Sequence, residues 1–568
     1  MTGQTQGGAA AAGRWLYGPA PDLLLGAGLA YLPVFALLAL AGDSVRQVLP
    51  LALMPLVALG LNLPHLGATL LRVYERREDR RRYALFAVHA TLVIAAAFFA
   101  GLFVPLVGSL LITLYLSVVP WHFAGQNYGI ALIFLARRGV EVPPAAKRFL
   151  YASFVLSFAM TLVGLHGGGI ATVAPVDPTG TVYGFLSLGI PSGVDQAALL
   201  LVSAAYLWTL VEAGSRLLAR APARDLLPAA AVVFTQALWF SAPILVNLLL
   251  FREEGMGPLA PAHYAYTAQW VALGHAVQYL WITRYYAERQ QPGLRGGPFF
   301  GKALLAGAAL YGFPMLLLAP GALGSLPYES GLVTMVAGAL NLHHVLLDGA
   351  IWKLRSGPVA RILIRGAAEG AEAAPPRARR RLPLAPLVWA SGATGVALMA
   401  LGTLEYEFGF QRAAARGDLE RLETASTRLA WLGREDPGLH ALIGALRGER
   451  GDPEGARRAL EQSLALHPTA NAWVDLGVLH EREGALPEAL AAYEAALALS
   501  PEYADALHYA GRAYLGAGHV ERARALLARA LRQAPQSPEI RRSLARARAA
   551  PLPATSPGAP RPPAGSPP

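Results

Sequence analysis

Segments of about 20 apolar residues, the length that a helix needs to cross the hydrocarbon core of a membrane, recur along the first 404 residues of this chain. Only 15% of all residues are charged, which is too few for an ordinary soluble protein of 568 residues. We therefore expect a polytopic bundle of about eleven transmembrane helices. They are predicted near residues 21–41, 49–72, 83–102, 104–136, 148–166, 195–213, 228–250, 263–284, 303–320, 328–352 and 384–404. The fourth segment contains Pro120, which predicts a kink there or a division into two shorter helices.

Lysine and arginine gather in every second loop between these segments. Residues 72–82 contain six arginines and residues 353–381 contain one lysine and seven arginines, whereas residues 167–194 contain neither. Because basic residues of short loops stay in the cytoplasm, we expect a cytoplasmic N-terminus and, after an odd number of spans, an outer location for everything beyond residue 404. No small-residue cleavage site follows the first apolar stretch, so we expect that helix to be retained. The predicted location is the inner (plasma) membrane of a bacterium.

Acidic and basic residues interleave densely after residue 404, and a repeated pattern begins there. Residues 470–501 read ANAWVDLGVLHEREGALPEALAAYEAALALSP. Trp473, Gly477, Tyr493 and Pro501 stand where the tetratricopeptide repeat has its characteristic residues, and the pattern recurs 34 residues later and once before. The region therefore resembles a tetratricopeptide-repeat (TPR) protein. The resemblance implies an α-solenoid whose concave face binds a protein or peptide.

The predicted fold class is thus all-α, a transmembrane helical bundle followed by a TPR solenoid. The C-terminal end of the chain is rich in proline and poor in apolar residues, so we expect it to be disordered. The expected division is an N-terminal segment at 1–20, a membrane domain at 21–404, a TPR domain at 405–548 and a proline-rich tail at 549–568.

Six histidines fall within the predicted spans, where ionisable side chains are costly and mark functional positions. These are His65, His89, His122, His275, His343 and His344. Counted back from the basic end of each span at about 1.5 Å per residue, His65, His275 and His344 lie roughly 10 to 13 Å deep, and His122 deeper. Helices can bring such residues together. We predict that His65, His122, His275 and His344 bind a metal ion.

Amides, a carboxylate and further histidines lie beside these candidates and can orient them. We predict this supporting role for His89, Gln126, Gln278, His343 and Asp348. The chain has no cysteine, which excludes a cysteine-ligated cofactor. Imidazole and carboxylate ligands suit iron, or else zinc, copper or manganese. A plainer interpretation is that the histidines make interhelical hydrogen bonds and that Asp348 pairs with Lys353.

Several functions remain open at the level of sequence. Histidines spread over separate membrane helices resemble, in plan only, the bacterial integral-membrane carotene dioxygenases, which implies a metal-dependent oxidoreductase or oxygenase acting on a membrane lipid. The alternative is a non-catalytic, membrane-anchored TPR scaffold for envelope protein assembly. A transporter is less favoured because no internal repeat relates the halves. A glycosyltransferase that joins many spans to TPRs is disfavoured because the first outer loop offers only Asp43 where that class has paired acidic residues. No nucleic-acid partner is expected, because the basic residues occupy loops between spans.

Overall fold

The chain was examined as a computed structural model, in which every regular element of the described residues is a helix. The structure describes residues 13–41, 54–75, 77–167, 182–250, 264–291, 293–318, 331–353, 357–365 and 385–551. Over these ranges the predicted all-α class is confirmed. Most of the proline-rich tail and of the N-terminal segment, and several predicted outer loops, lie outside them.

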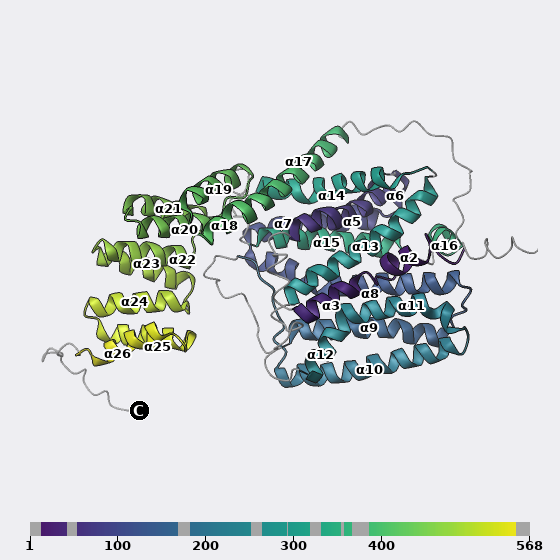
Figure 1. Cartoon of the computed structure of the whole chain (residues 1–568), viewed down its shortest axis with the longest axis horizontal. Helices are drawn as coiled ribbons and strands as arrows, with labels where there is room; N and C mark the ends of the chain where they lie inside the picture. Colours follow the sequence, from purple (N-terminus) through teal and green to yellow (C-terminus); the bar gives the residue numbers. More distant parts are fainter. Residues whose placement is uncertain are drawn as a thin grey trace, which may run out of the picture.

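The N-terminal two thirds of the chain form a bundle of long helices packed side by side (Figure 1). Its helices are α2 (Pro19–Pro21), η1 (Asp22–Gly26), α3 (Tyr31–Ala41), α5 (Met54–Tyr74), α6 (Arg77–Arg82), η3 (Leu85–Ala90), α7 (Thr91–Phe103), α8 (Pro105–Arg137), α9 (Pro144–His166), α10 (Ser192–Leu218), α11 (Ala223–Gln236), η4 (Ala237–Ser241), α12 (Ala242–Leu250), α13 (Tyr264–Gln290), α14 (Gly296–Leu318), α15 (Leu332–Ile351), α16 (Gly357–Leu363) and α17 (Ala385–Leu404). Elements η1, η3 and η4 are π-helical turns, which widen a helix locally.

Eight helices of the described residues are long and apolar enough to cross a membrane, and a ninth span results if the bent pair Pro19–Gly26 and Tyr31–Leu38 counts as one. The predicted number of eleven stays a prediction. Helix α13 matches the predicted segment 263–284 but is not among the eight. Its polar residues His275, Gln278 and Thr283 lower the mean hydropathy of the helix. They are buried against neighbouring helices and do not face outward from the bundle.

Helix α8 contains Pro120, where the sequence predicted a kink or a division into two helices. The helix runs through this proline as a single element of 33 residues. A proline removes one backbone donor, and tightly packed neighbouring helices tolerate that loss. The fourth predicted segment is therefore one helix and not two.

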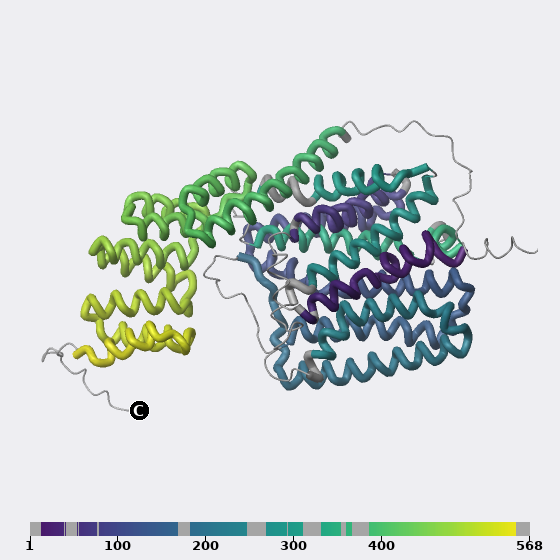
Figure 2. Tube along the Cα trace, viewed as in Figure 1, coloured from purple at the N-terminus to yellow at the C-terminus, as the bar shows by residue number. Residues whose placement is uncertain are grey.

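Helices α5 and α14 approach each other very closely and lie side by side along their length (Figure 2). A Cβ atom added at Gly67 would stand 1.8 Å from the carbonyl oxygen of Ala303, and one added at Gly307 would stand 2.0 Å from that of Leu63. Only glycine lets the two backbones meet in this way. This contact fixes the position of α5 beside the centre of the bundle.

The C-terminal region is a stack of antiparallel helix pairs that projects from one end of the bundle (Figure 1). After η7 (Glu405–Gln411) and α18 (Arg412–Ala414), it contains α19 (Leu419–Trp431), α20 (Pro437–Glu449), α21 (Pro453–Leu466), α22 (Ala470–Arg482), α23 (Leu486–Leu499), α24 (Ala504–Gly516), α25 (Val520–Gln533) and the closing helix α26 (Pro538–Ala549).

The repeat residues have clear packing roles. A Cβ atom at Gly477 of α22 would lie 2.4 Å from the ring of Tyr493 on α23, and one at Gly511 would lie 2.7 Å from Leu527. Small residues at these positions therefore let the two helices of each pair touch. Glycines with positive φ, such as Gly484 at 78° and Gly518 at 81°, follow the first helix of a pair and let the chain reverse.

Candidate metal centre and protein-binding face

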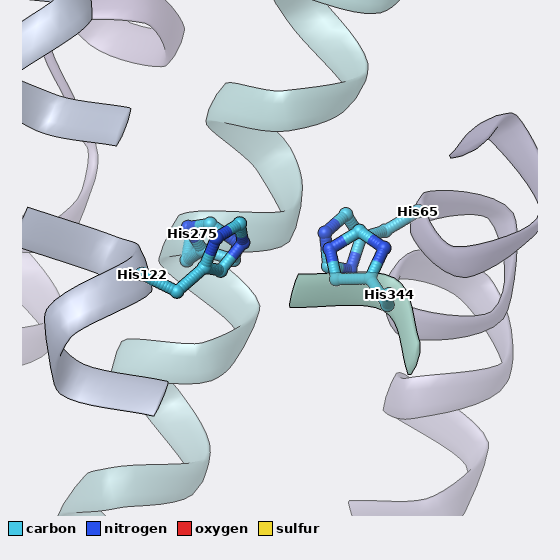
Figure 3. Close-up of side chains that lie close together, drawn as sticks. All are labelled: His65, His122, His275 and His344. Atoms are coloured by element: carbon cyan, nitrogen blue, oxygen red, sulfur yellow. The ribbon is translucent and has the colours of Figure 1, made fainter. Parts of the chain in front are cut away.

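Four histidines from four helices meet at the centre of the bundle (Figure 3). They are His65 on α5, His122 on α8, His275 on α13 and His344 on α15. One ligand nitrogen from each ring can be chosen so that all four lie within 4.8 Å of one another. Ligand atoms at about 2.1 Å from a common metal ion stand roughly 3 to 4 Å apart, so the cluster is slightly wider than a filled site.

The rings are nearly sealed from solvent and rest on one another. His65, His275 and His344 are each at most 3% exposed. The ring of His65 lies 4.2 Å from that of His344 and 5.0 Å from that of His275, centroid to centroid. Phe123, next to His122, stacks on His275 at 4.0 Å. Packing thus holds the four rings in place.

Six ring nitrogens of the cluster are buried and have no hydrogen-bond partner among the described residues. These buried atoms are Nε2 of His65, Nε2 of His122, and both nitrogens of His275 and of His344. An unpaired buried polar atom costs about 1–3 kcal/mol, so four rings with unpaired nitrogens call for a ligand that accepts one nitrogen from each ring and that the protein itself does not supply. A divalent metal ion is such a ligand, because neutral imidazole nitrogens are common donors to iron, zinc and copper.

The structure brings Asp348 to the cluster and leaves the other supporting candidates outside it. Asp348 Oδ2 lies 3.3 Å from Nε2 of His344 and 3.7 Å from Nε2 of His122. Gln126 donates to the Gln278 side chain and to the backbone of His275, and Gln278 donates to the backbone of Gly26. The two amides therefore join α8, α13 and η1, and neither is hydrogen-bonded to an imidazole ring.

The two remaining histidines lie elsewhere. His343 stacks on Tyr74, and its Nε2 lies 3.0 Å from the Tyr74 hydroxyl, so it connects α15 to α5 on the side away from the cluster. His89 is exposed on η3, where its Nδ1 lies 3.2 Å from the carbonyl oxygen of Ala84. The contacts of these two rings are thus with Tyr74 and with the backbone of Ala84, and their supporting role stays a prediction.

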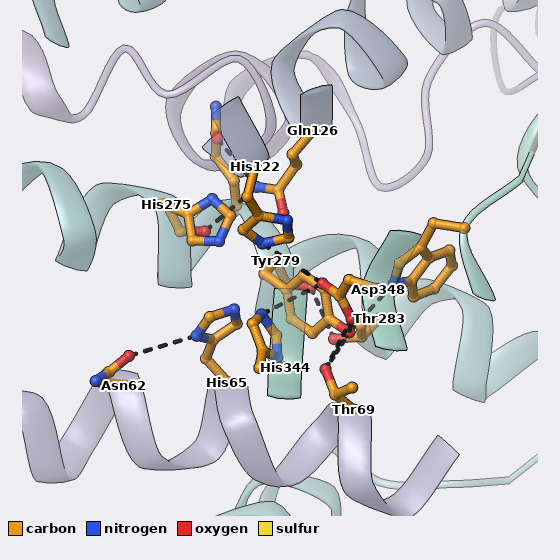
Figure 4. Close-up of polar contacts among 12 residues, drawn as sticks. Asn62, His65, Thr69, His122, Gln126, His275, Tyr279, Thr283, His344 and Asp348 are labelled. Atoms are coloured by element: carbon orange, nitrogen blue, oxygen red, sulfur yellow. Dashed lines mark hydrogen bonds and ion pairs between the residues drawn. The ribbon is translucent and has the colours of Figure 1, made fainter. Parts of the chain in front are cut away.

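Three residues that the sequence analysis did not select complete the surroundings of Asp348 (Figure 4). The hydroxyls of Tyr279 and Thr69 lie 2.7 Å and 3.0 Å from Oδ1 of Asp348, and Trp352 donates to the Tyr279 oxygen at 3.1 Å. Thr69 follows His65 by four residues, and Tyr279 follows His275 by the same interval. This i, i+4 spacing was the signal in the sequence that could have found them.

A narrow cleft lies beside His344, between α5, α14 and α15. Its apolar walls include Leu66, Leu70, Leu310, Leu340 and Leu347, and His343 and His344 also line it. Leu310 is 38% exposed on the outside of the bundle. The cleft thus runs from the outer surface of the bundle toward one of the candidate ligands.

The repeat region offers a second candidate site, on the face formed by the first helices of successive pairs. Helices α20, α22 and α24 pack side by side, and Arg512 of α24 reaches Glu481 of α22 at 3.4 Å across this face. We call it the inner face. Burial and the negative charge of Asp505 raise the pKa of Asp475, on α22, to about 6. A cationic group would relieve the repulsion between these carboxylates.

Comparisons with known proteins concern the C-terminal region. Two family models described as tetratricopeptide repeat match the chain, one over residues 443–504 and the other over residues 481–547. A search of curated proteins found no match. Among solved structures, one similar chain belongs to the crystal structure of the APC/C hetero-tetramer Cut9-Hcn1, with 14% identity, coverage of 84% of this chain and 98% of that one, and a TM-score of 0.24. That score is too low to support an argument about function. The family matches agree with the helix pairs described above, and residues 443–547 of this chain are therefore tetratricopeptide repeats.

Proposed function

We propose that this chain is a membrane-anchored adaptor that binds a protein partner through its TPR region and holds a metal ion within its membrane bundle. The TPR region supports the first part, because stacked repeats of this kind serve as extended protein-binding surfaces. The four-histidine cluster supports the second part and is the observation that carries it. The two parts are separable, and each can be tested without the other.

The surface of the bundle supports its placement in a membrane. Large apolar side chains point outward along the long helices, for example Phe103 at 85%, Leu201 at 72% and Leu92 at 64% exposure. Such a continuous apolar exterior is unfavourable in water and suits contact with lipid tails. The basic helix α6 and the helix α16 lie at the end of the bundle opposite the repeats (Figure 1). With basic ends retained in the cytoplasm, the repeats lie in the periplasm or outside the cell.

The chemistry that we propose for the metal centre is oxidation of a membrane lipid. Four imidazoles and a nearby carboxylate suit iron, and zinc, copper and manganese are compatible with the same donors. Iron, copper or manganese bound there would supply redox chemistry, and the protein would orient the ligands and exclude water. The leucine-lined cleft beside His344 is apolar, but its volume of about 10 Å³ holds only one water molecule, so a lipid would enter only if the surrounding helices separate. The alternative is a metal that only holds α5, α8, α13 and α15 together beneath a non-catalytic scaffold.

The first experiment is elemental analysis of the full chain purified in detergent without chelator. The test variant carries His122→Ala, His275→Ala and His344→Ala, and the control carries His89→Ala and His343→Ala, which removes two histidines outside the cluster. We expect about one equivalent of metal in the wild type and in the control, and less than a tenth of that in the test variant. A folded wild type without metal would contradict the metal centre and leave the adaptor function standing.

Metal-loaded protein then separates the two uses of the centre. Uptake of dioxygen that depends on added membrane lipid, and that is absent from the test variant, would support the oxidoreductase. Loaded protein that consumes no dioxygen with any lipid fraction, yet unfolds at a lower temperature once the metal is removed, would support the scaffold.

A further inference from the structure

The two oxygens of the Asp348 carboxylate have different surroundings. Asp348 lies on α15, one turn after His344, and is 4% exposed. Its Oδ1 lies within hydrogen-bond distance of two hydroxyl donors, those of Tyr279 and Thr69. Its Oδ2 has no hydrogen-bond partner among the described residues. One oxygen is therefore anchored, and the other is left free to face the histidines.

The free oxygen lies at the distance expected between two neighbouring ligands of one ion from His344, and slightly farther than that from His122. Donor atoms at about 2.1 Å from a metal stand about 3.0 Å apart in octahedral and about 3.4 Å apart in tetrahedral geometry. Asp348 Oδ2 lies 3.3 Å from Nε2 of His344 and 3.7 Å from Nε2 of His122. Neither contact is an aligned hydrogen bond, because both nitrogens are also without a hydrogen-bond partner. An ion shared by the three atoms explains all three unpaired positions at once.

Charge leads to the same conclusion. Four neutral imidazoles around a divalent ion leave two positive charges in the apolar centre of the bundle, which is unfavourable without a counter-charge. A carboxylate ligand removes one of them. Among the charged side chains of the described residues, Asp348 is the one whose carboxylate oxygen lies within 3.7 Å of nitrogens of two cluster histidines.

The anchoring of Oδ1 explains why the carboxylate cannot turn away. Tyr279 packs edge-on against His65 at 4.6 Å and receives a hydrogen bond from Trp352. The guanidinium of Arg72 stacks over the Trp352 ring at 4.5 Å. Thr69 lies on α5, the helix that also carries His65. Tyr279 and Thr69 are thus positioning residues for Asp348.

We propose that Asp348 is a fifth, carboxylate ligand of the four-histidine centre, which then favours a divalent ion such as Fe²⁺ or Mn²⁺ over Cu⁺. The inference rests on the proposed metal centre. A hard oxygen donor stabilises divalent ions that accept mixed nitrogen and oxygen ligands, whereas Cu⁺ prefers soft ligands. The sequence offers this ligand on the same helix face as His344, at i, i+4.

Cobalt(II) is a suitable probe, because its visible absorption is stronger with four ligands than with five. The full chain, freed of metal and then titrated with Co²⁺ and Mn²⁺, is compared with Asp348→Asn and Asp348→Leu. We expect Mn²⁺ to bind at least about 100-fold more weakly to both variants and the cobalt absorption to intensify in Asp348→Leu. Tyr279→Phe and Thr69→Val keep the Asp348 carboxylate but remove a hydroxyl that anchors it. Both should weaken Mn²⁺ binding about 3- to 30-fold and shift the cobalt spectrum toward that of Asp348→Leu.

The outcomes distinguish this inference from the function on which it rests. Wild type that binds neither Co²⁺ nor Mn²⁺ would overturn the metal centre itself. Wild type that binds them, with unchanged affinity and spectrum in Asp348→Asn and Asp348→Leu, would overturn the fifth ligand and leave the four histidines. If the Asp348 variants do not fold, a changed cobalt spectrum in Tyr279→Phe supports the ligand, and an unchanged one overturns it. His89→Ala, which alters an exposed histidine outside the cluster, should behave as wild type throughout.

Discussion

At the scale of single residues, the four candidate ligands share one local pattern. Each is followed four residues later by a polar side chain on the same helix face: His65 by Thr69, His122 by Gln126, His275 by Tyr279 and His344 by Asp348. Three of these followers, Thr69, Tyr279 and Asp348, meet in one hydrogen-bonded group. These three residues lie one helical turn beyond the histidines of their own helices. They can meet only if α5, α13 and α15 run in the same direction, because the next turn then lies at the same height in all three helices.

The residues of the inner face allow a sharp test of the adaptor function. Tyr509, half-buried on α24, lies beside Arg512 of this face and can be replaced by the photo-crosslinking analogue azidophenylalanine, which is close to tyrosine in size. We expect one discrete crosslinked protein in intact cells from this position and none from the exposed Glu488 on α23. Because Asp475 and Asp505 repel each other, the partner should be cationic, and Asp505→Lys should lower the crosslinked yield at least about tenfold.

The matched charge change Glu488→Lys should leave that yield unaltered. Equal crosslinking from Tyr509 and Glu488 would contradict the inner face as the binding surface. A product that survives Asp505→Lys at full yield would contradict the cationic partner alone.

At the scale of helices, the position of His65 depends on the contact between α5 and α14. Gly67→Ala places a methyl group 1.8 Å from the Ala303 carbonyl oxygen, so the two helices must separate. We expect this variant to lose about 1–3 kcal/mol of stability and most of its bound metal, because His65 lies two residues away on the helix that moves. Metal content and the midpoint of thermal unfolding measure the two effects.

Gly60 provides the control on the same helix. A Cβ atom there meets no atom within 4 Å, so Gly60→Ala should keep its metal and be as stable as wild type or up to about 1 kcal/mol more stable. If Gly67→Ala retained metal and stability to the same degree as Gly60→Ala, the close approach of α5 and α14 would not govern the site.

At the scale of the whole molecule, the basic end of the bundle and the repeats lie at opposite ends (Figure 1). The chain has no cysteine, so single cysteines report their own side of the membrane without background. A membrane-impermeant maleimide added to intact cells, with the outer envelope made permeable, should label Glu521→Cys on α25 and not Arg81→Cys on α6. Both should react after detergent lysis. The reverse pattern of labelling would contradict the proposed orientation and place the TPR partner in the cytoplasm.

Much of this architecture could be predicted from the sequence because it depends on local regularities. The repeat period follows from small residues such as Gly477 and Gly511, whose spacing is visible along the chain and whose purpose is the close contact within each helix pair. The four clustered histidines could be selected because ionisable groups in apolar segments are rare and costly. The alternation of basic loops with apolar segments also predicts an orientation in the membrane, which stays a prediction.

The tertiary structure alone decided which side chains meet. His343 and His344 are neighbours in sequence, yet about 100° of helical rotation sends one ring to Tyr74 and the other to the centre. Thr69 and Asp348 are 279 residues apart, and their hydrogen bond exists because α5 and α15 pack against each other. Sequence periodicity fixes the face of a helix but carries no information on the partner, the depth or the rotation of a helix elsewhere in the chain. Those are set by close contacts such as that of Gly67 with Ala303. For this reason the candidate ligands and Asp348 beside His344 could be predicted, whereas the hydrogen bonds that Thr69 and Tyr279 donate to Asp348 could not.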